Sequence, residues 1–145
     1  GADVECINMS CESINDAISP ASADIVFASN YFEHLDSKEQ IITIFKNANS
    51  ILKQGGKFII LQPNIKYTKE AYWDFIDHKL PLTDKALIEA GEMTGFKLYK
   101  NIARFLPYTT KSRIPQFAFL IRLYLLFLPL SGFFMGQQSL IILEK

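Results

Sequence analysis

This 145-residue chain has no excess of either charge, because its fifteen basic residues balance fifteen acidic ones. The balance argues against a general electrostatic attraction to nucleic acid, and we expect no nucleic-acid partner. Cysteine is scarce: Cys6 and Cys11 are the only two, and no cluster of cysteine and histidine has the spacing of a zinc site. We therefore predict free thiols in a reducing compartment, a cytoplasmic location and no metal site.

Glycine-rich phosphate-binding loops are also missing. The chain has seven glycines, and none belongs to a G-x-G-x-x-G motif or another phosphate-cradling loop. The pair Gly55-Gly56 stands between a helical pattern and a strand pattern, where the end of a helix is its expected role. A nucleotide-type site would therefore be incomplete in these residues. Length and a 49% hydrophobic content fit one domain, residues 1–145, with a real core.

Alternating strand and helix patterns predict an α/β fold. The apolar run Ala23–Ser29 is typical of a strand covered on both faces in a parallel sheet. Apolar residues then recur at helical spacing, with Asp36 and Glu39 as the expected capping box and Gly55 as the expected C-terminal cap. Because another strand is predicted at Lys57–Pro63, the unit is expected to be a right-handed strand–helix–strand crossover.

The rest of the chain supplies further predicted elements. Thr83 is the expected N-cap of a second helix, which Leu82 and Leu87 would close as a hydrophobic staple. Gly95 is expected to end that helix. Three more strands are predicted at Val4–Ser10, Phe96–Phe105 and Ser139–Lys145.

An apolar insertion, Pro107–Gly136, precedes the last predicted strand. Its centre, from Phe117 to Leu130, is almost entirely apolar apart from Arg122. The uninterrupted part is shorter than the roughly 20 residues that cross a bilayer. The first interpretation is a buried or dimer-forming helix, and the alternative is a helix lying on a membrane surface. Gly132 and Gly136 form a G-x-x-x-G motif, which alone is weak evidence for helix pairing in lipid.

Polar clusters follow three predicted strands. In open α/β sheets, ligands bind beyond the carboxyl ends of the strands. Parallel strands would bring these clusters to one rim, which predicts a binding site there. The clusters are SCES (10–13), SNYFEH (29–34) and PNIKY (63–67).

The stretches ADIVFASNYFEHL and ILKQGGKFIILQPN, with an amphipathic helix between them, resemble the C-terminal half of class I S-adenosylmethionine-dependent methyltransferases. They are similar to that family's aspartate-led fourth strand, the helix after it and the Leu-x-x-Gly-Gly lead into the fifth strand. Two later stretches, WDFIDHKLPLTDKALIEAGEMTGF and RFLPYTTKSRIPQ, resemble a narrower bacterial branch of this family, described as type 11/12-like. Genes of that branch often accompany polysaccharide and glycosyl-transfer genes.

The resemblance covers about Val4 to Lys145 and implies a Rossmann-like methyltransferase fold, mostly parallel with an antiparallel last strand. It also implies that the chain lacks the family's first two strands, its glycine-rich loop and the acidic residue that holds the ribose. We therefore expect a fragment of a longer enzyme, inactive or weakly binding when alone.

The resemblance implies methyl transfer with S-adenosylmethionine as the cofactor. The loop after the fourth strand would line the methionine end of the cofactor with Ser29, Asn30 and Phe32. Ser10 and Cys11 would lie beside the adenine. The alternatives are that Asn30 caps a turn and that Phe32 packs in the core.

The acceptor side of the predicted site has several candidates. His34 is either a general base or a residue that orients its loop through the backbone. Asn64 either binds the acceptor or stabilises a turn. The aromatic patch of Tyr67, Trp73 and His78 would bind a sugar or another flat acceptor, and a packed lid helix has the same pattern.

The leading hypothesis is methyl transfer to a small-molecule or saccharide acceptor, which includes lipid-linked saccharides. Lys111 and Arg113 would contact a phosphate or lie in a solvated loop. The alternatives are a non-catalytic membrane-surface or dimerisation module and a nicotinamide-dependent oxidoreductase, which needs the missing glycine motif. The strand Ala23–Ser29 lacks a neighbour, so either Val4–Met9 or a second copy is expected to pair with it. We predict a homodimer with peripheral membrane contact through residues 117–130.

Overall fold

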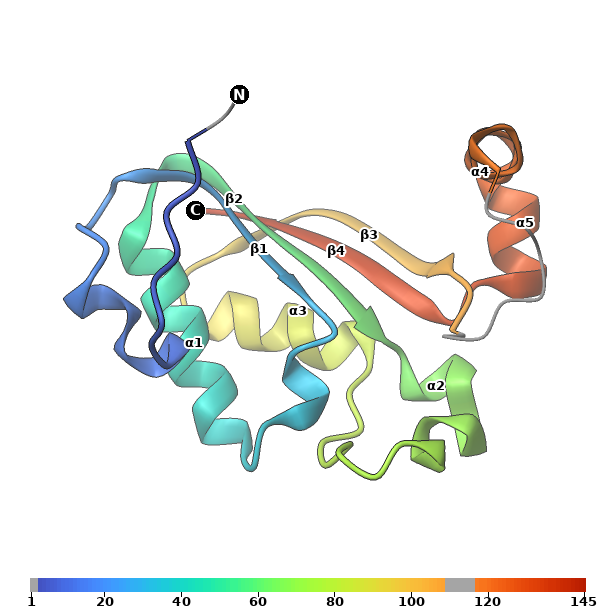
Figure 1. Cartoon of the computed structure of the whole chain (residues 1–145), viewed down its shortest axis with the longest axis horizontal. Helices are drawn as coiled ribbons and strands as arrows, with labels where there is room; N and C mark the ends of the chain where they lie inside the picture. Colours follow the sequence, from blue (N-terminus) through green and yellow to red (C-terminus); the bar gives the residue numbers. More distant parts are fainter. Residues whose placement is uncertain (1–2, 109–116) are drawn as a thin grey trace.

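A four-stranded sheet in the order β1-β2-β4-β3 organises the computed structural model, which describes residues 3–108 and 117–145 (Figure 1). Strands β1 and β2 are parallel, whereas β4 is antiparallel to both of its neighbours, β2 and β3. Three strands thus run in one direction and the last runs against them, which confirms the predicted fold class. The strands are β1 (Ala23–Ser29), β2 (Leu52–Pro63), β3 (Lys97–Leu106) and β4 (Gln138–Glu144).

The two longest helices, α1 and α3, lie on the same side of the sheet in Figure 1. The opposite face of β1 is open, because Ile25 and Phe27 are 59% and 62% exposed. The prediction that this strand is covered on both faces is therefore wrong. The α-helices are α1 (Lys38–Ile51), α2 (Ile65–Thr68), α3 (Asp84–Met93), α4 (Ala118–Leu126) and α5 (Leu128–Met135), and the 3-10 helices are η1 (Cys11–Asp16), η2 (Phe32–His34) and η3 (Lys69–Asp74).

The caps of α1 differ from the prediction by one residue at its start and by more at its end. Ser37, not Asp36, is the N-cap, and it forms a capping box with Gln40 at N3. Gly55 is not the C-cap, because the helix ends at Ile51 and β2 begins at once. Instead Gly55 lies within β2 at φ +78, where the register against β1 shifts. Glycine adopts this left-handed conformation without a Cβ clash.

The capping box gives a stability prediction. Replacing Ser37 with alanine removes the acceptor for the Gln40 amide, and we expect a loss of about 1 kcal/mol in the free energy of unfolding. Urea denaturation followed by circular dichroism measures this change. Ser37→Asp keeps a capping oxygen and serves as the control. An alanine variant as stable as the aspartate variant would contradict the assignment of this cap.

Helix α3 agrees with its predicted boundaries. Thr83 caps the helix by accepting a hydrogen bond from the amide of Ala86. Leu82 and Leu87 are both buried, as a hydrophobic staple requires. The helix ends just before Gly95, which has a φ of +90.

The predicted strand Val4–Ser10 is wrong, because these residues form no sheet ladder and all except the half-buried Met9 are exposed. Ser10 begins the 3-10 helix η1 by accepting a hydrogen bond from the amide of Glu12. The side chain of Asn47 in α1 donates to the carbonyl oxygens of Cys11 and Glu12. These bonds hold η1 against α1, and residues 4–10 before it therefore do not pair with the edge of β1.

The core lies between the sheet and the two helices. Its centre is aromatic: the Phe45 ring lies 5.4, 5.1 and 6.4 Å from the ring centroids of Phe32, Phe58 and Phe96. All four rings are buried, and such close aromatic packing is typical of a stable small core.

The described helical part of the apolar insertion, residues 117–136, is not one helix and is mostly exposed. It forms α4 and α5, bent by 100° to one another, and α4 has no buried residue. Gly132 and Gly136 bring α5 against the backbone of Arg104 in β3, because a Cβ on either would meet the Arg104 carbonyl oxygen within 2.5 Å. These glycines therefore serve packing onto the sheet within the chain. Among the described residues, only this bent pair, and no single helix, has the length and hydrophobicity that crossing a membrane requires.

Candidate functional site

The rim at the carboxyl end of β1 is built by a sharp turn at Asn30. This residue has a φ of +47, a left-handed conformation that asparagine tolerates better than most residues. Its amide donates to the carbonyl oxygen of Leu61 at 2.9 Å, which ties the turn to β2. The backbone of Asn30 thus takes the turn role that was the alternative to cofactor binding. Its side chain is exposed, as is that of Ser29.

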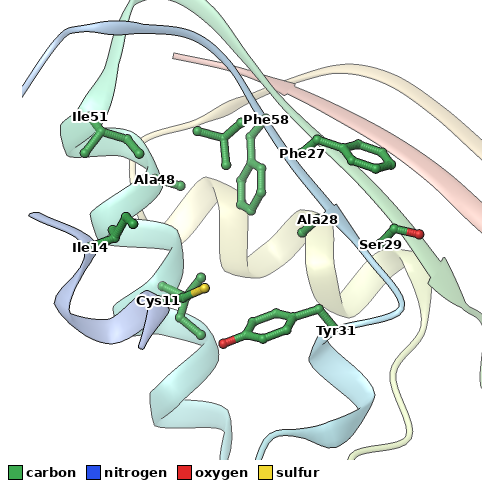
Figure 2. Close-up of a pocket in the computed structure, with 11 residues that line it drawn as sticks. Cys11, Ile14, Phe27, Ala28, Ser29, Tyr31, Ala48, Ile51 and Phe58 are labelled. Atoms are coloured by element: carbon green, nitrogen blue, oxygen red, sulfur yellow. The ribbon is translucent and has the colours of Figure 1, made fainter. Parts of the chain in front are cut away.

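A cavity of about 270 Å³ lies beside this rim, between β1, α1 and η1. Figure 2 shows the Tyr31 side chain reaching from the end of β1 toward Cys11 in η1. The cavity therefore joins the first two predicted polar clusters, although no strand precedes the first one. Its lining comprises Cys11, Ile14, Val26, Phe27, Ala28, Ser29, Tyr31, Ile44, Ala48, Ile51 and Phe58.

The lining fits only part of S-adenosylmethionine. The Tyr31 hydroxyl, the Cys11 thiol and Ser29 are its polar groups, and the remaining side chains are apolar. An apolar wall with a few polar groups suits the flat adenine ring or the methylene chain. The amino and carboxylate groups of the cofactor need charged or backbone partners, and none of the lining side chains is charged. The predicted adenine neighbour Ser10 is not among the lining residues.

Tyr31 also has a perturbed acidity. Burial raises its pKa from 10.0 to about 12, and Cys11 and Glu12 add to the rise. Burial, with help from Glu33, likewise raises the pKa of Tyr108 to about 12. Both phenols therefore stay protonated at neutral pH and are able to donate hydrogen bonds.

These two tyrosines predict a loss of stability in alkali. Their folded pKa values lie above the unfolded value of 10.0, so their contribution is complete below pH 10 and is lost as the pH rises through about 12. Denaturant titrations across this window, with phenolate absorbance as the second readout, should show the decrease. Tyr31→Phe should make the decrease smaller, whereas exposed Tyr99→Phe should not. An equal pH dependence in Tyr31→Phe and the wild type would contradict the assignment.

Phe32 follows Tyr31 and is fully buried between Phe45 and Phe58. Its side chain therefore packs in the core, as the alternative interpretation proposed, and the described conformation leaves it no access to a cofactor.

Glu33 is the residue of this turn that the sequence did not single out. Its side chain is 1% exposed, and its Oε2 accepts a hydrogen bond from the Gln62 amide at 2.8 Å. Its backbone oxygen accepts from the amides of Lys79 and Leu80, which fixes the later loop to this turn. The sequence carries no clear signal for this burial, because Glu33 stands between Phe32 and the polar His34.

His34 and His78 lie together although they are far apart in the sequence. Their ring centroids are 5.2 Å apart. The Nδ1 of His34 is 3.2 Å from the backbone oxygen of Asp77, and the Nδ1 of His78 is 2.8 Å from that of Tyr72. His34 thus makes the loop-orienting backbone contact that was one of its two interpretations, and its role as a general base stays a prediction.

Asn64 is turned away from the rim. Its side chain is buried and donates to Asp84 Oδ1 at 2.8 Å and Ser139 Oγ at 2.9 Å, while its oxygen accepts from the amide of Lys66. Asn101 also donates to Asp84, which completes a network that joins the N-cap of α2, directly after β2, to α3, β3 and β4. Asn64 therefore has a structural role here, and the predicted acceptor contact finds no free group on its side chain.

The predicted aromatic patch divides into two parts. Trp73 is 56% exposed and packs edge-on against the buried Tyr72, whose ring also contacts His78. Tyr67 instead lies under the guanidinium of Arg104, 5.0 Å from its ring centroid. Lys111 and Arg113, the predicted phosphate contacts, lie outside the described residues.

Comparisons with known proteins agree with the described fold. A family profile described as "Methyltransferase domain" matches residues 1–60, which include β1, α1 and the start of β2. No match is found among curated protein sequences.

Solved structures with this fold include S-adenosylmethionine-dependent methyltransferases from Archaeoglobus fulgidus (18% identity, TM-score 0.69), Methanosarcina mazei (12%, 0.61) and Mesorhizobium loti (13%, 0.59). They cover 96%, 94% and 88% of this chain, respectively. The chain spans only 66%, 65% and 64% of their lengths. The likeness establishes that the fold is the one found in these methyltransferases.

Proposed function

We propose that this chain takes part in the transfer of a methyl group from S-adenosylmethionine to an acceptor. The observation that carries the proposal is the rim after β1, where Ser29, Tyr31 and Cys11 meet at one cavity on a methyltransferase fold. The family profile over residues 1–60 supports the same assignment, since those residues build that rim.

In such a reaction these residues would position the cofactor. S-adenosylmethionine itself supplies the activated methyl group through its sulfonium. The cavity would hold an apolar part of the cofactor, and the protonated Tyr31 hydroxyl would donate a hydrogen bond to it. Because the lining offers no partner for the charged ends of the cofactor, we propose that the described residues bind it weakly.

For the acceptor we propose a saccharide or a lipid-linked saccharide, which is the chemistry of the polysaccharide-associated branch that the sequence resembles. Trp73 supports this choice, because an exposed aromatic face suits a sugar ring. His34 is the proposed general base if the acceptor hydroxyl must lose its proton, and its 37% exposed side chain is within reach of solvent.

We further propose that α4 and α5 contact the lipid surface that carries such an acceptor. Large apolar side chains on both helices are exposed, including Phe119 at 70%, Leu126 at 74% and Phe134 at 71%. Flotation with liposomes tests this contact, and Phe119→Ser combined with Phe134→Ser should abolish it. Failure of the unaltered protein to float with neutral or anionic liposomes would overturn it.

A homodimer is the proposed assembly, because the outer edge of β1 has no partner strand among residues 3–108 and 117–145. Light scattering after size-exclusion chromatography should give twice the chain mass. A monomer at all accessible concentrations would contradict this proposal.

Nuclear magnetic resonance tests the proposed cofactor position. S-adenosylhomocysteine at millimolar concentration should shift the amide signals of Cys11, Ser29 and Tyr31, and adenosine alone should shift part of the same set. Tyr31→Ala should reduce the shifts, whereas exposed Tyr99→Ala should leave them unchanged. No shifts at the rim, or shifts concentrated at another surface, would overturn the proposed function.

A further inference from the structure

The only two histidines of the chain, His34 and His78, meet the buried Glu33 at the end of β1. One nitrogen of each imidazole and one oxygen of the carboxylate all lie within 4.8 Å of one another. These residues come from η2 and from the loop after η3, so the fold and not a local sequence motif brings them together. Their spacing in the sequence is not that of a known zinc motif, which is why the sequence predicted no metal site.

The hydrogen bonds of both imidazoles leave the same nitrogen available. The Nδ1 of His34 faces the Asp77 carbonyl oxygen at 3.2 Å, and the Nδ1 of His78 faces the Tyr72 carbonyl oxygen at 2.8 Å. A carbonyl oxygen only accepts, so each Nδ1 must donate a proton. In the neutral imidazoles the lone pair is therefore on Nε2. A backbone carbonyl behind the opposite nitrogen is the usual support of a metal-binding histidine.

The carboxylate of Glu33 adds a negative charge in a buried place. Its Oε2 accepts from Gln62, while Oε1 lies 3.8 Å from the Nε2 of His34. No lysine or arginine of the described residues forms an ion pair with Glu33. A buried carboxylate that faces an imidazole lone pair is unfavourable unless a cation or a proton lies between them.

We propose that Glu33, His34 and His78 bind a divalent transition-metal ion such as Zn²⁺ through one carboxylate oxygen and two Nε2 atoms. Two imidazoles and one carboxylate favour zinc, iron, cobalt or nickel over magnesium and calcium, which prefer oxygen ligands. Ligands about 2.1 Å from a tetrahedral zinc ion lie about 3.4 Å from each other, so a small side-chain movement closes the site. Asp77 would help to orient the His34 ligand, because its Oδ2 lies 3.3 Å from the Nδ1 of His34.

Three protein ligands leave a coordination position open for water or for an oxygen of another molecule. A metal there would polarise an acceptor hydroxyl, and this use rests on the proposed function, whereas metal binding itself does not. With the metal bound, His34 would act as a ligand, so its proposed role as a general base applies to the metal-free site.

Calorimetry with zinc chloride tests the site directly. The protein should carry Cys6→Ser and Cys11→Ser, because both thiols are exposed and free and would bind zinc themselves. After treatment with a chelator, it should bind one Zn²⁺ per chain, and Mg²⁺ should give no heat of binding. His34→Ala and His78→Ala should each weaken zinc binding by at least about 100-fold. Glu33→Gln, which removes the carboxylate ligand, should also weaken zinc binding. The exposed Glu92→Gln is its matched control and should leave the affinity unchanged.

Long-range ¹H–¹⁵N spectra of the imidazoles give the second measurement, which needs no variant. Zinc should shift the Nε2 resonances of both histidines and leave Nδ1 protonated. The proposal is overturned by the absence of saturable zinc binding, by an unchanged affinity in both histidine variants, or by unshifted Nε2 resonances at saturating zinc. Because no cofactor is present in either measurement, failure here leaves the methyl-transfer proposal standing, and the rim titration tests that proposal separately.

Discussion

Replacing Phe45 with alanine should lower the free energy of unfolding by about 3–5 kcal/mol. The Phe45 side chain is fully buried, and its ring packs against Phe32, Phe58 and Phe96. Alanine would remove contacts to all three rings and leave a cavity where α1 meets the sheet. Because Phe32 directly follows Tyr31, the loss should also loosen the rim after β1.

Chemical denaturation measures this loss, and hydrogen exchange at the amides of Tyr31 and Glu33 reports the loosening of the rim. Phe119→Ala is the matched control, since its ring is 70% exposed and its loss should change stability by no more than about 0.5 kcal/mol. A Phe45→Ala variant within about 1 kcal/mol of the wild type would contradict the described core, given the usual cost of emptying such a site.

Replacing Asn64 with alanine should destabilise the protein by about 2–3 kcal/mol, since buried groups left without partners each cost about 1–3 kcal/mol. The Asn64 amide donates to Asp84 and Ser139, and without it the buried Asp84 carboxylate keeps only its bond from Asn101. The network joins the residue after β2 to α3, β3 and β4, so its loss should affect packing at that end of the sheet.

Two comparisons make the Asn64 prediction specific. Asn15→Ala removes an exposed amide pair with Asn47 and should have little effect. Ser139 is itself a hydrogen-bond partner of Asn64, so Ser139→Ala and Asn64→Ala should not be additive when combined. Unchanged stability in Asn64→Ala would contradict the structural role and restore the acceptor-binding interpretation for this residue.

The sheet and its helices were largely predictable because their signals are local. The apolar run of β1, the helical spacing of α1 and the Thr83 cap each depend on residues close in sequence, and the structure confirms all three elements. Val4–Ser10 failed because a strand also needs a neighbouring strand. Its apolar residues carry no information on whether such a neighbour is present. The local path is instead set by the cap at Ser10, which is a weak sequence signal, and by the bond from Asn47, which is distant in sequence.

The candidate site was predictable only as a region. The rule that ligands bind beyond the carboxyl ends of strands pointed to the Tyr31 turn, which lines the cavity, whereas Cys11 reaches the same cavity from η1 and follows no strand. It could not tell which side chains at a strand end point inward, and Asn64 and Phe32 proved to be buried. The meeting of Glu33 with His78 depends on the loop after η3, whose path is fixed by backbone bonds from Lys79 and Leu80 to Glu33.

The α4–α5 segment shows a different limit. Its hydrophobicity favoured a buried helix, but burial depends on whether the rest of the chain offers a surface of the right size. Here the segment contacts β3 mainly through the glycine face of α5 against Arg104, and most of its large apolar side chains stay exposed.

Calorimetric titration with S-adenosylhomocysteine tests the central claim most directly. That claim is that the described residues form the rim of a methyltransferase site without partners for the charged ends of the cofactor. We predict a dissociation constant of about 1 mM or weaker, equivalent to about 4 kcal/mol of binding free energy. Binding by the 145-residue chain with a dissociation constant of about 1 μM, near 8 kcal/mol, would contradict it.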